Sequence, residues 1–467
     1  MKAGRATLIA LLLASGCTMA PKYERPKGAV PASFPTGDAY KQPAKETLPA
    51  IDRAAIFKDA RLLALMDQAL ANNRDLRVAA ANIARARAQF RVQRAELFPE
   101  LDATGQVQRT ENATLKATTF SAELSVPSYE VDLFGRIRSL TNEAQERYFG
   151  TEATARATRL ALLGDIAGGW LQYAADKSLL ALAQDTAESA RKTVSLTQAR
   201  LEGGVATRTD FAQAQTILAT AESDLAKQKT AVAQDLNLLT LLVGAPVDAT
   251  QLPGSIEEAA QTIGDPPTAT SSEVLLRRPD VLSAEYDLRA ANADIGAARA
   301  ELFPKITLAG LLGLASGSLE SLFGSAGTSA LQGTAAATYP IFRAGAGKAN
   351  LAASEAQRDA SLATYEKAIQ TAFREVSDAL ARRGTMDEQL AADTRRAAAA
   401  GDAFQLSEAR YKNGIDSFLV ELDSQRSSYA AQQTLVATRL EAANNRVTLY
   451  RTLGGDALTP AADEPKH

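Results

Sequence analysis

The sequence predicts a mainly α-helical protein with a small β part, and two observations carry this prediction. No proline occurs between Pro127 and Pro246 or between Pro340 and Pro460, so two stretches of 118 and 119 residues are free to form very long helices. Four shorter segments alternate apolar and polar residues, which is the period of a strand with two unlike faces. We therefore expect long helices that flank two β-hairpins.

The composition excludes several functional classes. A net charge of −3 argues against a nucleic-acid binder held by bulk positive charge. A single Cys excludes a disulfide framework, and a single His, the terminal His467, excludes His-based catalysis and His-rich metal sites. No Gly-x-x-x-x-Gly-Lys-Ser/Thr loop occurs, so the chain does not draw energy from ATP. Carboxylates are plentiful, but Ala-rich helices offer no evident cleft, and we expect no enzyme, no metal site and no cofactor.

The N-terminus is similar to the export signal of a bacterial lipoprotein. Residues 1–16 combine a basic start with an apolar run that is too short to span a bilayer. The only cysteine, Cys17, follows where cleavage is expected, and we expect it to carry a lipid such as palmitate. Ala14 stands where the usual pattern prefers Leu, and an ordinary cleaved signal is the alternative. Thr18 after the cysteine favours the outer membrane over the inner one.

A proline-rich segment follows at residues 17–50. Six of the 17 prolines fall between residues 21 and 49. Since proline fixes φ and removes a backbone donor, we expect an extended, lipidated tether here rather than a packed element.

The rest of the chain repeats itself. Arg94–Pro99 recurs as Arg299–Pro304 after 205 residues, and Ala199–Gly204 matches Ala409–Gly414 after 210 residues. Ordered matches at nearly one offset indicate an internal duplication, and the period is far too long for a solenoid. The predicted segments are a first repeat at 51–265, a second repeat at 266–459 and a tail at 460–467.

Each repeat carries one predicted hairpin followed by a long helical stretch. Phe120–Val126 alternates without error, and three other segments share the pattern, so we expect strands at about 101–130 and 305–341. The stretch Arg136–Arg200 has no strong break and would extend about 100 Å as one helix.

Four strands pose a physical problem, because an open sheet has two unpaired edges. Within a membrane, β-strands are stable only in a closed barrel, and about eight strands are the smallest number that closes one. If the strands span a bilayer, the chain must therefore oligomerise. Two hairpins that cap a soluble helical bundle are the alternative.

Glu130–Arg136 and Tyr339–Gly345 follow the two hairpins and complete an ordered series of motifs. With the repeated Ala-Arg-x-x-x-Gly and the lipoprotein start, the chain resembles a TolC-type outer-membrane factor, most closely the NodT-type lipoproteins that serve RND drug efflux. The resemblance covers nearly everything after residue 50. It implies a homotrimer in which four strands from each chain form a β-barrel in the bacterial outer membrane, above an α-helical barrel that extends into the periplasm.

The resemblance also implies a function and its partners. The trimer would be the exit duct of a tripartite efflux system, which passively passes drugs or other small molecules to the outside. A periplasmic adaptor protein and an inner-membrane RND pump would be its protein partners, and outer-membrane lipid would surround the barrel.

Helix-turn-helix tips form the periplasmic end of such ducts, and two segments match them, Gly204–Asp210 and Gly414–Leu419. Their glycines suit a tight reversal at positive φ. An ordinary helical turn is the alternative reading of the same residues. The resemblance implies adaptor contacts at Gly204, Val205, Ala206, Gly414, Ile415 and Ser417.

Polar links between neighbouring helices hold the closed end of such ducts. By motif, Asp210 and Tyr411 occupy positions that can pair across that end, and Thr209 also matches. The family can place an Arg where this chain has Asp416, and this departure puts the matching salt bridge in doubt. Asp423 matches a position that can form an acidic, cation-sensitive ring in the lumen, and a solvated helix residue is the alternative.

Two other functions remain open. A periplasmic coiled-coil lipoprotein without a channel explains the helices and the cysteine but not the alternating hairpins. A duct of the same shape could serve protein secretion or metal efflux. Four Met and one His argue against a lumen for soft metals, and a lipid anchor favours drug efflux over protein secretion.

Overall fold

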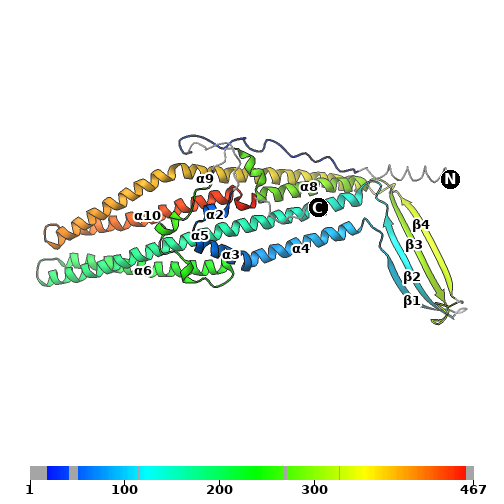
Figure 1. Ribbon diagram of the computed structural model, residues 1–467, viewed down its shortest axis with the longest axis horizontal. Helices are drawn as coiled ribbons and strands as arrows, with labels where there is room; N and C mark the ends of the chain where they lie inside the picture. The colour runs from blue at the N-terminus through cyan, green and yellow to red at the C-terminus, as the bar shows by residue number, and fades with distance from the viewer. Residues whose placement is uncertain (1–17, 41–50, 113–115, 268–270, 325–326, 459–467) are drawn as a thin grey trace. The chain divides into compact units, whose positions relative to one another are not determined.

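The computed structural model describes residues 18–40, 51–112, 116–267, 271–324 and 327–458 (Figure 1). The predicted signal peptide at 1–16, the predicted lipidation site Cys17 and the predicted tail at 460–467 lie outside the described residues. The described chain forms two compact units. Of the described residues, the first unit contains those within 18–27, 81–153 and 282–367, and the second contains those within 28–80, 154–281 and 368–458.

The first unit contains a four-stranded antiparallel sheet in the order β1-β2-β3-β4 (Figure 1). The prediction of four strands in two hairpins is confirmed, and pairing of β2 with β3 joins the hairpins into one sheet. The strands are β1 (Asp102–Glu111), β2 (Lys116–Glu130), β3 (Lys305–Ser316) and β4 (Thr328–Thr338).

Two features of this sheet follow directly from its sequence. The register of β2 against β3 shifts between Val126 and Tyr129, at Pro127, which has no N–H to give to a ladder. The outer strands β1 and β4 each pair on one side only within the described chain, and every residue of β4 is exposed. These unpaired edges are available for pairing with strands of another chain.

The long helices confirm the internal repeat. Each hairpin is preceded by a 22-residue helix and followed by a 67-residue one, and each 67-residue helix leads into a helix of 35 or 36 residues. Among the described helices, none is both long enough and apolar enough to cross a membrane. In chain order they are α4 (Arg74–Ala95), α5 (Arg136–Glu202), α6 (Arg208–Val243), α8 (Pro279–Ala300), α9 (Ala346–Lys412) and α10 (Phe418–Thr452).

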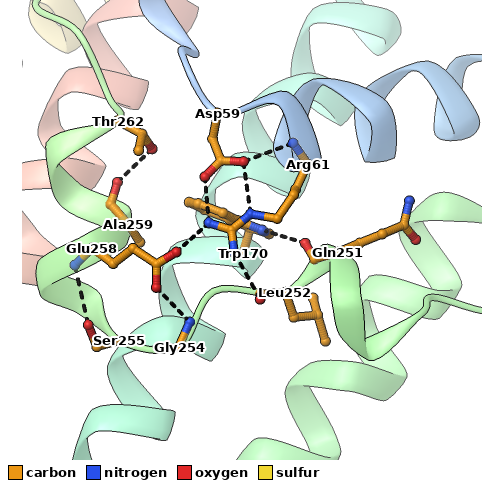
Figure 2. A network of polar contacts seen from close by, with 10 residues as sticks. All are labelled: Asp59, Arg61, Trp170, Gln251, Leu252, Gly254, Ser255, Glu258, Ala259 and Thr262. Carbon is orange, nitrogen blue, oxygen red and sulfur yellow. Dashed lines mark hydrogen bonds and ion pairs between the residues drawn. The ribbon is translucent and has the colours of Figure 1, made fainter.

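Short elements of the second unit contact two buried aromatic residues, since Trp170 donates to the Gln251 carbonyl and Tyr450 packs against Phe57. The short elements are α2 (Arg53–Ile56), α3 (Ala60–Asn72), η1 (Ala249–Gln251), α7 (Ile256–Gln261), η2 (Ser272–Arg277) and η3 (Gly455–Leu458). A polar network joins three of them, α3, η1 and α7, to one another and to α5, as Figure 2 shows. Arg61 forms ion pairs with Asp59 at 2.7 Å and with Glu258 at 2.5 Å, and its guanidinium holds the pKa of Asp59 below its usual value.

The described part of the proline-rich segment corrects one expectation. Residues 18–40 contain no helix, as expected, but they are not an unpacked tether. In the first unit, Arg25 forms an ion pair with the buried carboxylate of Glu285 at 2.7 Å, and the Tyr23 hydroxyl donates to the same carboxylate at 3.2 Å. A Cβ on Gly296 of α8 would lie 2.7 Å from the Ala20 side chain, so this glycine makes room for the segment.

The same segment also packs in the second unit. Phe34 is buried and stacks on Phe373 of α9, with ring centroids 5.2 Å apart. Gly384 of α9 has no room for a side chain, because a Cβ would collide with the carbonyl oxygen of Ala39. The tether prediction fails because aromatic and charged residues between the prolines find partners on helices more than 200 residues away.

Candidate functional site

The first helical tip lies in the second unit and joins α5 to α6. Gly204 has a φ of 73°, and the N–H of Val205 donates to the carbonyl of Arg200 at 2.9 Å, which closes the end of α5. α6 then starts with a capping box. The Thr207 hydroxyl accepts from the Asp210 N–H at 3.1 Å, and the Asp210 carboxylate accepts from the Thr207 N–H at 2.9 Å.

The second tip, between α9 and α10, has the same backbone conformation as the first but different side-chain contacts. Gly414 has a φ of 71°, and the N–H of Ile415 donates to the carbonyl of Arg410 at 2.9 Å. Ser417, the N-cap residue of α10, makes no side-chain cap bond. Instead Asp416 accepts two bonds from Arg410, at 2.6 and 2.9 Å, which lower the pKa of Asp416. The departure from the family pattern thus places an ion pair inside the tip itself.

One arginine ties the two tips to each other. Arg200 of α5 donates to the carbonyl oxygen of Tyr411 at 3.0 Å, and its guanidinium lies 4.7 Å from the centre of the Tyr411 ring. The Tyr411 hydroxyl lies 3.4 Å from Thr197 Oγ1. Because both a charged hydrogen bond and a cation–π contact come from one side chain, Arg200 fixes the end of α9 against α5.

An apolar cluster beneath this contact involves all four helices of the tips. Its buried members come from α6, α9 and α10, and residues of α5 and α6 pack against them. The hairpins therefore pack as one body rather than as two independent arms. The buried members are Ala214, Tyr411, Phe418 and Leu422, and the packed neighbours are Val194, Leu196 and Ile217.

Three large apolar side chains are exposed on the outer surface of the tips. Val205 is 69% exposed, Ile415 at the equivalent position of the second tip is 62% exposed, and Leu419 is 63% exposed. Val205 and Ile415 therefore present apolar side chains to solvent at matched positions of the two tips.

Residues 65–245 and 270–455 match the family model described as "Outer membrane efflux protein". The chain belongs to the outer membrane efflux protein family. It is 40% identical over 465 residues to the solvent efflux pump outer membrane protein SrpC of Pseudomonas putida, covering 97% of this chain and 98% of that protein. It is 39% identical over 458 residues to the outer membrane protein OprJ of Pseudomonas aeruginosa, with coverage of 96% and 95%.

Solved structures of outer-membrane channels have the same fold as this efflux protein. The open state of the MtrE outer membrane channel of Neisseria gonorrhoeae superimposes with a TM-score of 0.85 at 33% identity, covering 94% of this chain and 99% of that one. CusC gives a TM-score of 0.83 at 33% identity, with coverage of 94% and 100%. The predicted family, the predicted fold class and the function as an outer-membrane efflux protein are confirmed.

Within this efflux protein, the predicted gate residues occupy different environments. The carboxylate of Asp210 is engaged in its own capping box, and Tyr411 is only 4% exposed within the apolar cluster. Thr209 and Asp423 are exposed. In the part of the chain that the structure describes, no hydrogen bond joins Asp210 to Tyr411, so their pairing across the closed end stays a prediction.

Two residues of the tips were not anticipated from the sequence. Arg200 lies inside the repeated Ala-Arg-x-x-x-Gly motif, but the motif by itself does not show that its side chain reaches the second hairpin. Glu421 lies on the buried face of α10, three residues after Phe418 and next to Leu422. The helical spacing of Phe418 and Leu422 predicts a buried face, and Glu421 falls on that same face, so the sequence pattern does indicate a carboxyl at a core position.

Proposed function

We propose that this efflux protein is the exit duct of a tripartite system that carries small, mostly apolar compounds such as solvents or antibiotics out of the cell. The printed names of its relatives support this range, since they include solvent, toluene and antibiotic efflux pumps. An inner-membrane RND pump and a periplasmic adaptor would deliver the compound, and the duct would pass it without a catalytic step.

The observation that carries the proposal is the sheet with two unpaired edges. The described part of one chain supplies four strands whose outer edges are unpaired, and three copies would supply twelve strands to a closed barrel. Native mass spectrometry of the detergent-extracted protein should give a trimer. A stable monomer with folded strands would overturn the barrel.

The lipid anchor at Cys17 is a second part of the proposal. A labelled fatty acid should enter the wild-type chain and should be absent from Cys17→Ala. The variant should still assemble, because a closed barrel is itself a membrane anchor. If no label enters the wild-type chain, the chain is not a lipoprotein.

We also propose that the tips form the gate and the adaptor contact. Asp210 and Tyr411 of neighbouring chains would link the closed end, and the exposed Asp423 carboxylates of three chains would form a ring. Asp210→Ala combined with Tyr411→Phe should raise single-channel conductance in planar bilayers. Asp423→Ala should mainly weaken block by multivalent cations. A double variant that stays trimeric and conducts like the wild type would remove this pair from the gate.

The exposed apolar surface of the tips is the expected adaptor contact. Val205→Asp and Ile415→Asp should reduce cross-linking of the trimer to the adaptor in intact cells, because each places a charge in an apolar contact. Undiminished cross-linking in both variants would place the adaptor elsewhere.

A further inference from the structure

Glu421 occupies a core position of the second tip although it is an acid. It lies in the first turn of α10, on the face that also buries Phe418, Leu422 and Gln425. It is 3% exposed, and within the described chain its Oε2 atom is buried without a hydrogen-bond partner. The first repeat has Phe211 at the equivalent position, 210 residues earlier, so the position suits an apolar side chain.

The charged groups that face Glu421 do not neutralise it. On α9, Lys412 is bound to Glu408 at 2.7 Å, and on α5, Arg200 is bound to Tyr411. Burial raises the pKa of Glu421 to about 7, the nearby Glu408 carboxylate contributes to this rise, and Lys412 and Arg200 act in the opposite direction. A carboxyl with a buried oxygen that has no partner is more stable as the neutral acid than as the anion.

We propose that Glu421 is a proton-dependent latch of the second tip, neutral while the ends of α9 and α10 are packed together and loosening that packing when its proton leaves to solvent. The first turn of α10 is also less firmly held than that of α6, because Ser417 makes no side-chain cap bond whereas Thr207 caps α6. The latch lies in the second tip, which the proposed function makes part of the gate, and in that respect it rests on the proposed function. The packing of α9 against α10 can nevertheless be measured without a transport assay.

The direction of the pH effect follows from the two states of the tip. When the tip is packed, the pKa of Glu421 is about 7, and when it is loosened the carboxyl returns to its ordinary value of 4.5. The packed state therefore binds the proton more tightly. Packing is strongest below about pH 4.5, weakens as the pH rises to about 7, and changes no further above that. Acid should close the tip and neutral to alkaline pH should loosen it.

Hydrogen–deuterium exchange of the detergent-solubilised protein tests the latch. The exchange rate of peptides over residues 405–425 should be compared between the wild type and Glu421→Gln from pH 5 to pH 8. Intrinsic exchange rates cancel in the ratio of wild type to variant, so this ratio should rise tenfold or more with pH, because the amide side chain of the variant cannot ionise. A ratio that stays constant across this range would overturn the proposal. Glu202→Gln, at an exposed carboxyl of the first tip, is the matched control and should leave the pH dependence unchanged.

A second variant separates ionisation from a merely structural role. Glu408→Gln removes the neighbouring negative charge, so the pH at which the tip loosens should move downward. An unchanged midpoint would show that Glu421 does not titrate in this range and would overturn the latch.

Single-channel recordings over the same pH range distinguish the latch from the proposed function. Exchange that depends on pH together with conductance that does not would support the latch and contradict the gate at the tips. Exchange and conductance that change together would support both.

Discussion

Replacing Arg200 with Met should weaken the link between the two tips. Met keeps an apolar stem of similar length but loses the charged donor to the Tyr411 carbonyl and the contact with the Tyr411 ring. A hydrogen bond from a charged group contributes about 1.5–3 kcal/mol, and an exposed cation–π contact about 0.5–1 kcal/mol. Because Arg200 is half-buried and the two contacts share one side chain, we expect a loss of about 2 kcal/mol in tip packing.

Local hydrogen–deuterium exchange at pH 7 is the measurement for this change. A loss of about 2 kcal/mol corresponds to exchange about 30-fold faster in the last turns of α9. The midpoint of thermal unfolding should change little, since the tips are one end of long helices. Arg208→Met, which removes an exposed arginine from the start of α6, is the control and should leave exchange in α9 unchanged. Exchange within about twofold of the wild type in Arg200→Met would refute the assigned role of Arg200.

Three further predictions use matched positions. Thr207→Ala should destabilise the first turn of α6 by about 1 kcal/mol, whereas Ser417→Ala should be nearly neutral because no cap bond is lost, and peptide-level exchange would show both. Gly384→Ala should lower the melting temperature because its Cβ collides with a backbone carbonyl, whereas Gly401→Ala in the same helix has open space and should raise stability by about 0.5–1 kcal/mol. Burial and a neighbouring carboxyl raise the pKa of Asp235, so stability should fall as the pH rises above the usual range of an aspartate, and Asp235→Asn should abolish that part of the pH dependence in thermal unfolding curves.

Much of the fold is predictable because it depends on local pattern. Alternation locates the strands to within a few residues, since one side-chain period distinguishes them from helices. The proline-free stretches locate α5 and α9 for the complementary reason, because nothing in them breaks a helix. Repetition of short motifs then indicates two related halves.

The contacts of the tips depend on partners that no local pattern identifies. The sequence places Tyr411 at the second tip, but not its burial against Phe418 or its bond from Arg200. The Arg410–Asp416 pair likewise depends on how the turn brings residue 416 back toward residue 410. The packing of Phe34 was missed because prolines indicate extended backbone without indicating which surface it lies on.

The packed N-terminal segment has a consequence for the order of events during export. Its partners lie far along the chain: 262 residues separate Tyr23 from Glu285, and 241 separate Pro31 from Ser272. A chain that is exported from its N-terminus presents this segment first, but α8 and α9 arrive only after most of the sequence has crossed. The earliest residues to emerge are therefore among the last to dock.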